Sequence, residues 1–102
     1  MRFNSLSKVT LTNPSMQLVR LCKHMGHKIP IEHDEDKAKF TFEFGLCQLL
    51  AEGNTLTMYC QTGSQDDLEK MQDIMARHLE QMAWKDEPTV TWQATDNAPI
   101  LN

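Results

Sequence analysis

Long hydrophobic runs and an excess of positive charge are both missing from this sequence. No apolar stretch approaches the ~20 residues that a membrane-spanning helix needs, and residues 1–9 hold one arginine and no apolar segment of the kind found in secretory signals. Ten basic residues stand against 14 acidic ones, a formal net charge of −4. A nucleic-acid binder needs several cations on one face. We therefore expect a cytoplasmic protein whose partner is neither a membrane nor a nucleic acid.

Catalytic signatures are also absent. The sequence contains no Gly-rich phosphate loop, no G-x-S-x-G and no H-E-x-x-H motif. No pair of nucleophile and base stands out, and the acidic residues of 32–36 are typical of a solvated turn. We expect a non-enzymatic protein. An enzyme acting in a pocket between helices and sheet is the least favoured alternative.

The composition is that of an ordinary globular protein, with 40% hydrophobic and 24% charged residues. A chain of 102 residues is long enough to bury a core without disulfides. We expect a single domain over residues 1–102, of which 96–102 form a loose tail. The three cysteines are an odd set without framework spacing, so reduced thiols are expected.

Two segments have helical periodicity. Asn13 and Pro14 are typical of an N-cap and the first helical position, and Gly26 is expected to end this helix as a C′ glycine. A capping box formed by Ser64 and Asp67 predicts a second helix that runs to about residue 83. The predicted buried stripes are Leu18, Leu21, Cys22 and Met25 on the first helix, and Leu68, Met71, Ile74, Met75, Leu79 and Met82 on the second.

Six segments are typical of strands: 9–11, 29–33, 38–44, 46–52, 55–62 and 89–92. Two turns set the register of the middle four strands. The predicted pairs are Ile31 with Phe40, Ile29 with Phe42, Glu32 with Lys39, Ala51 with Leu56, Leu49 with Met58, and Cys47 with Cys60. The order β-α-β-β-β-β-α-β predicts an α+β fold: a two-layer sandwich with a mostly antiparallel sheet and two helices on one face.

The densest group of cations lies at the end of the first predicted helix. It consists of Arg20, Lys23, His24, His27 and Lys28. On an acidic protein such a cluster predicts a surface that binds an acidic ligand or partner. The alternative is that these cations only complement the helix dipole and keep the helix soluble.

A second candidate site is a metal site built from inward-facing residues: Cys22, Cys47, Cys60 and His78. Three thiolates and an imidazole can bind zinc or iron. Because no C-x-x-C motif supports this site, we expect no cofactor, with zinc or iron as the alternative, and buried cysteines that act as small hydrophobes. A local metal site of Cys22, His24 and His27 is disfavoured because Cys22 and His24 lie ~200° apart around a helix. The opposed Cys47 and Cys60 have the spacing of a disulfide, although a pair of thiols is favoured.

Four segments resemble a family of small bacterial proteins of unknown function whose members often lie beside, or are fused to, siderophore-interacting flavoproteins. The segments are Arg20–Lys28, Phe42–Cys47, Ala76–Glu80 and Val90–Trp92. The resemblance implies an accessory domain linked to iron acquisition, with a siderophore-interacting flavoprotein as a partner. It brings no catalytic residues, and Cys60 lies outside the matching segments.

The outer face of the predicted sheet also carries apolar side chains. Leu46, Leu50 and Tyr59 alternate onto this face. Self-association through it is therefore an open alternative, and the sequence does not set the oligomeric state.

Overall fold

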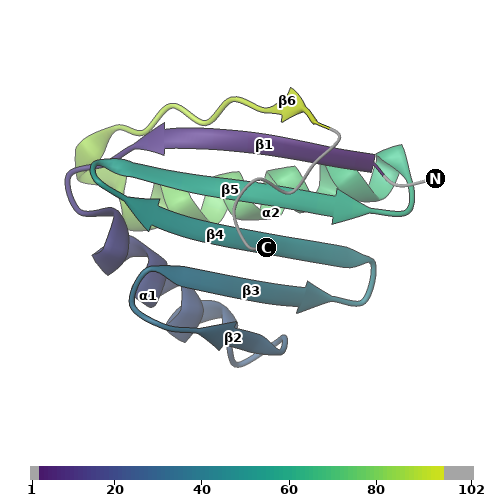
Figure 1. Ribbon diagram of the computed structural model, residues 1–102, viewed down its shortest axis with the longest axis horizontal. Helices are drawn as coiled ribbons and strands as arrows, with labels where there is room; N and C mark the ends of the chain where they lie inside the picture. Colours follow the sequence, from purple (N-terminus) through teal and green to yellow (C-terminus); the bar gives the residue numbers. More distant parts are fainter. Residues whose placement is uncertain (1–2, 96–102) are drawn as a thin grey trace.

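The computed structural model describes residues 3–95 and contains a six-stranded sheet with two helices (Figure 1). The elements in chain order are β1 (Phe3–Thr10), α1 (Pro14–Met25), β2 (Ile31–His33), β3 (Lys37–Phe42), β4 (Gly45–Glu52), β5 (Thr55–Thr62), α2 (Gln65–Met82), the 3-10 turn η1 (Trp84–Asp86) and β6 (Gln93–Ala94). The sheet order is β2-β3-β4-β5-β1-β6, and every pair is antiparallel. Both helices lie on one side of the sheet (Figure 1). The predicted α+β fold is confirmed.

The register of the central strands is the one that the alternation of side chains predicts. Ile31 pairs with Phe40, Leu49 with Met58, and Cys47 with Cys60. Gly53 begins the turn between β4 and β5 with a φ of 61°, a conformation that costs glycine little. The inner face of these strands is buried against the helices. A one-residue slip would expose this whole apolar set, so the burial fixes the register.

The core lies between this inner face and the buried stripes of the two helices. Phe40, Leu49 and Met58 from the sheet are fully buried, as are Met71 and Met75 from α2. The other fully buried apolar side chains of the core are Val9, Leu18, Leu21, Cys47, Leu56, Cys60 and Leu79. The stripes predicted for both helices thus form the upper layer of the sandwich, although Ile74 and Met82 are only half-buried.

Both helices begin as predicted. The Asn13 side chain accepts a hydrogen bond from the Met16 amide at 3.1 Å, and the Ser64 hydroxyl accepts one from the Asp67 amide at 3.1 Å. The first helix ends at Met25 and is followed by Gly26, as expected, although Gly26 does not take the left-handed conformation common for a C′ glycine. Gly26 is right-handed (φ −63°), and its amide donates to the Cys22 carbonyl at 2.9 Å.

All strands except β5 have bounds that differ from the prediction. β3 spans Lys37–Phe42 instead of 38–44, and β4 begins at Gly45 instead of 46. The predicted pair of Ile29 with Phe42 lies outside the β2–β3 ladder.

β1 begins at Phe3, six residues before the predicted start. The sequence did not predict this first part because its buried inner face carries serines instead of apolar residues. β2 begins at Ile31 because Pro30 has no amide to donate, although its carbonyl accepts a bond from the Thr41 amide at 3.0 Å.

The predicted last strand, segment 89–92, forms no ladder. The observed last strand, β6, begins directly after it, at Gln93. Val90 and Trp92 pack against the core without pairing, and only Gln93 and Ala94 pair with β1. The prediction of a tail over 96–102 lies outside the described residues.

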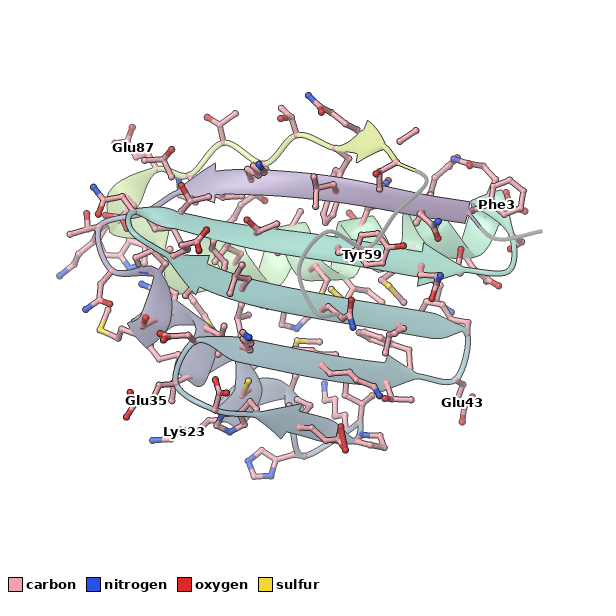
Figure 2. The ribbon with its side chains drawn as sticks, viewed as in Figure 1. Phe3, Lys23, Glu35, Glu43, Tyr59 and Glu87 are labelled. Carbon is pink, nitrogen blue, oxygen red and sulfur yellow. The ribbon has the colours of Figure 1, made fainter. Side chains whose placement is uncertain are left out.

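The outer face of the sheet is less open than its sequence indicates. Tyr59 lies on the face away from the helices (Figure 2), yet only 1% of its surface is exposed. Leu46 and Leu50 are half-buried on the same face. Self-association through this face stays a prediction, and it depends on these two leucines. Within residues 3–95, no helix is long and apolar enough to cross a membrane.

Candidate binding site between the two helices

The predicted cationic cluster is exposed, but its members face different parts of the surface. All five side chains, Arg20, Lys23, His24, His27 and Lys28, are exposed. His24 and Lys28 line a cavity between α1 and α2, whereas Arg20 lines a second cavity at the other end of α1. Lys23 extends away from the sheet (Figure 2), and neither Lys23 nor His27 lines these cavities. The cluster is therefore divided between two cavities, and Lys23 and His27 lie on the exposed surface outside both.

The structure brings two histidines together that the sequence assigned to separate sites. The ring centroids of His24 on α1 and His78 on α2 lie 5.3 Å apart, with the rings tilted by 53°. The Nδ1 atom of His78 lies 2.6 Å from the Ile74 carbonyl oxygen. Because a carbonyl only accepts, Nδ1 carries the proton of this bond. The bond holds the ring in place and leaves Nε2 as the free nitrogen.

These imidazoles form one wall of a cavity of about 220 Å³. Its lining residues are His24, Met25, Lys28, Ile29, Phe42, Ile74 and His78. The floor is apolar, and the polar groups are the two imidazoles and the Lys28 ammonium. No acidic residue is among the lining residues. Few polar groups above an apolar floor are typical of small-molecule sites.

The turn after α1 explains how this cavity forms. The amides of Lys28 and Ile29 both donate to the Met25 carbonyl, at 3.0 and 3.2 Å. These bonds fold the chain back over the end of the helix and place Lys28 beside it. The carbonyl end of α1 carries partial negative charge, which attracts the cations placed there. Any anion bound in the cavity needs those cations to offset the same field.

The predicted cysteine set has another character. Cys47 and Cys60 are fully buried, and their Sγ atoms lie 3.8 Å apart as free thiols. Their shared hydrogen bond and their burial raise the pKa of the Cys47 thiol well above its usual range. Burial raises the pKa of Cys22 to about 11. The positions of Cys22 and Cys47 thus favour the protonated, unreactive thiol.

The metal-site prediction has no gathered ligand set in the described part of the chain. Among residues 3–95, no three His, Cys, Asp or Glu side chains lie in a group that could hold a metal ion. His78 contacts His24 and the Ile74 carbonyl, and it lines the cavity as a half-buried residue. Zinc or iron binding stays a prediction that these observations do not test.

The sequence pointed to both histidines but not to their contact. His78 lies on the edge of the apolar stripe of α2, and His24 lies on the flank of α1. Their contact depends on how the two helices pack side by side over the sheet, which local periodicity does not report. The apolar residues that flank both positions were the available signal.

An open antiparallel sheet with both helices on one face, and a pair of imidazoles between those helices, defines a small α+β domain with an interhelical cavity. The chain belongs to the DUF2218 family, described as "uncharacterized protein conserved in bacteria", whose family model matches residues 6–93. The predicted resemblance to a bacterial family of unknown function is confirmed. All candidate site residues lie inside the matched segment.

The chain is also similar to a solved structure, the NMR structure of PA4090 from Pseudomonas aeruginosa. The two chains are 33% identical, the match covers 89% of this chain and 95% of that one, and the TM-score is 0.75. Comparison with curated proteins finds no match.

Proposed function

We propose that this protein is a non-enzymatic binding module that holds a small anion with an apolar body, such as a carboxylate, in the cavity between α1 and α2. The contact between His24 and His78 carries the proposal. Two imidazole rings from different helices meet above an apolar floor beside Lys28, and no acidic residue is among the lining residues. An anion between them would receive charge-assisted hydrogen bonds from the protonated rings and from Lys28.

The hydrogen-bonding state of the rings supports this function over a purely structural pair. Within residues 3–95, no hydrogen bond satisfies Nε2 of His78 or either ring nitrogen of His24. Nδ1 of His78 is engaged by the Ile74 carbonyl, so the ring can present a donor at Nε2 when it is protonated. Both rings can therefore act on a ligand without losing a bond within the fold.

The size of the cavity limits the ligand. Drug-sized ligands occupy pockets of roughly 300–1,000 Å³, and this cavity measures about 220 Å³. Met25, Ile29, Phe42 and Ile74 would cover the apolar part of the ligand. A short aliphatic or single-ring carboxylate fits this description, whereas a large polar molecule does not.

The experiment is a titration with benzoate and hexanoate, followed by NMR chemical shifts and calorimetry. A lost charge-assisted hydrogen bond costs about 1.5–3 kcal/mol, so His24→Ala and His78→Gln should each weaken benzoate binding roughly tenfold or more. The matched control is His27→Ala, an exposed imidazole at the same helix end that does not line the cavity.

Two outcomes would contradict the proposal. One is equal binding of benzoate and of its neutral analogue benzamide, which would remove the role of the cations. The other is unchanged benzoate affinity in both cavity variants, which would place the binding elsewhere on the protein.

The family resemblance adds a proposal about the protein partner. We propose that the exposed cations outside the cavity, Lys23 and His27 with Arg20, contribute to docking on a siderophore-interacting flavoprotein in iron acquisition. Reversing the charge at Arg20 and Lys23 should abolish capture of such a flavoprotein while leaving the melting temperature nearly unchanged. Capture that survives the double reversal would contradict this docking role.

The alternative function, metal or redox handling through Cys22, Cys47 and His78, is less well supported. A metal must displace the thiol protons. Burial raises the pKa of Cys22, and the hydrogen bond with Cys60, together with burial, raises the pKa of Cys47. Elemental analysis of the purified protein tests this alternative directly, because it requires stoichiometric zinc or iron.

A further inference from the structure

The exposed large apolar side chains of the described residues lie at one place. They are Met16, 45% exposed on α1, and Trp84, 66% exposed on η1. Both line a cavity of about 440 Å³ where the start of α1 meets the end of α2; Figure 1 shows these two helix ends at the same end of the sheet. An exposed indole and an exposed thioether thus lie beside the same hollow, where they could cover an apolar part of a ligand.

Two cations line the same cavity. They are Arg20 and Lys85, and within residues 3–95 neither of them forms an ion pair. The Lys85 ammonium lies 5.7 Å from the centre of the Trp84 ring, on its face. One acid, Asp86, also lines the cavity, but both of its carboxylate oxygens accept bonds from Thr12. These bonds leave Asp86 charged, so the two cations and one carboxylate give the lining a formal charge of +1.

A buried amide completes the wall. Gln17 is 5% exposed, lines the cavity, and has a side-chain oxygen without a partner in the described part of the chain. A buried amide oxygen without a hydrogen-bond partner destabilises the fold. A donor group of a bound molecule that reaches this wall would remove this destabilisation.

We infer that this cavity is a second ligand site, for a planar aromatic anion. The aromatic ring stacks on Trp84 beside Met16, and the phosphate or carboxylate group binds Arg20, whose fork of N–H donors matches such groups, together with Lys85. A ring N–H or O–H group pairs with the Gln17 amide. The volume lies within the range of small-molecule sites, and none of the lining residues belongs to the His24–His78 cavity.

Intrinsic fluorescence tests this site selectively. The chain has two tryptophans, so Trp92→Phe leaves Trp84 as the single indole. Adenosine monophosphate supplies a ring and a phosphate, adenosine the ring alone, and inorganic phosphate the anion alone. We expect adenosine monophosphate or indole-3-carboxylate to change the Trp84 emission saturably, and each half molecule to bind at least tenfold more weakly. Comparison of these two full probes distinguishes a phosphate from a carboxylate ligand.

Substitutions locate the binding. Arg20→Gln and Lys85→Gln should each weaken the ring-bearing anion about tenfold, because each removes one charged contact. The control is Arg77→Gln, since Arg77 is an exposed arginine of α2 that pairs with Asp73 and does not line the cavity. Calorimetry on the unsubstituted protein repeats the measurement if Trp92→Phe does not fold. The inference is overturned if neither ring-bearing anion binds, if phosphate alone binds equally tightly, or if Arg20→Gln leaves the affinity unchanged.

Discussion

The carboxylate of Asp86 accepts two hydrogen bonds from Thr12, one from the hydroxyl at 2.7 Å and one from the amide at 3.0 Å, across 74 residues of chain. The bonds join the loop before α1 to the turn after α2. They thereby link the start of α1 to the end of α2. Thr12 and Asp86 also line the cavity that Trp84 lines. The hydroxyl bond, followed by the amide bond, lowers the pKa of Asp86 below its usual value of 3.8.

Acid should therefore weaken the fold partly through Asp86. Because its pKa is lower in the folded state, its contribution is fully present above about pH 4 and is lost as the pH falls through the folded-state pKa. Asp86→Asn should lower the stability at neutral pH and make the decrease between about pH 5 and about pH 2 shallower. Denaturant unfolding at several pH values measures both effects.

The control for this prediction is Glu35→Gln, an exposed carboxylate in the β2–β3 turn (Figure 2). A decrease in acid that is equally steep in Asp86→Asn and in the unsubstituted protein would contradict the role of Asp86. Part of the decrease should persist in every case, because the Asp36 and Lys37 amides also lower the pKa of Asp34.

Alkaline pH should weaken the fold through Cys22. Burial raises its pKa from 9.0 to about 11, so the folded state holds the thiol proton more tightly than the unfolded chain does. The resulting stability is complete below about pH 9 and is lost as the pH rises through about 11, a decrease on the order of 1–2 kcal/mol. Cys22→Ala should flatten this decrease in unfolding experiments. An unchanged slope would show that the thiol does not ionise in this range.

The three thiols should react only through unfolding. Cys22, Cys47 and Cys60 are at most 4% exposed, and a reagent such as Ellman's reagent needs an accessible thiolate. We expect their reaction in the native protein to be slower than in denaturant by on the order of a thousandfold or more, in line with the fraction of unfolded molecules. Rapid modification of one thiol in the native state would contradict the burial of that cysteine.

Gly45 and Gly63 make a matched pair for a test of packing. A Cβ atom at Gly45 would lie 2.5 Å from the Gln61 carbonyl oxygen and 2.8 Å from the Met71 methyl group, whereas one at Gly63 meets nothing within 4 Å. Gly45→Ala should therefore destabilise the protein by about 1–3 kcal/mol. Gly63→Ala should change the free energy of unfolding by about 0.5 kcal/mol or less. Equal effects of the two substitutions would contradict the close approach of β4, β5 and α2 at this point.

The parts of the fold that were predictable are those with constraints on both faces. The pairing of Glu32 with Lys39 and of Cys47 with Cys60 follows from alternation and turn position. The early part of β1 escaped prediction because Ser5 and Ser7, polar residues, are buried on its inner face. Gln72 of α2 donates to the Ser5 hydroxyl at 2.8 Å, so its burial depends on a partner 67 residues away. No local pattern contains that information.

The candidate sites were predictable in composition but not in arrangement. The cations at the end of α1 stand out in the sequence, yet their division between two cavities depends on where α2 lies. His24 and Lys28 line one cavity together with His78, and Arg20 lines the other together with Trp84. His78 and Trp84 both belong to the second half of the chain. Trp84 gave no signal of its own, because a single aromatic residue after a helix usually belongs to the core.

The two margins of the sheet have a consequence for behaviour at high concentration. The outermost strands of residues 3–95 are fragments: β2 has three residues and β6 has two. Long unpaired margins act as templates onto which further molecules add, the route to fibrils. Because β2 and β6 are this short, the sheet edges offer few sites for such growth. Solutions of this protein should therefore stay free of fibrils even at high protein concentration.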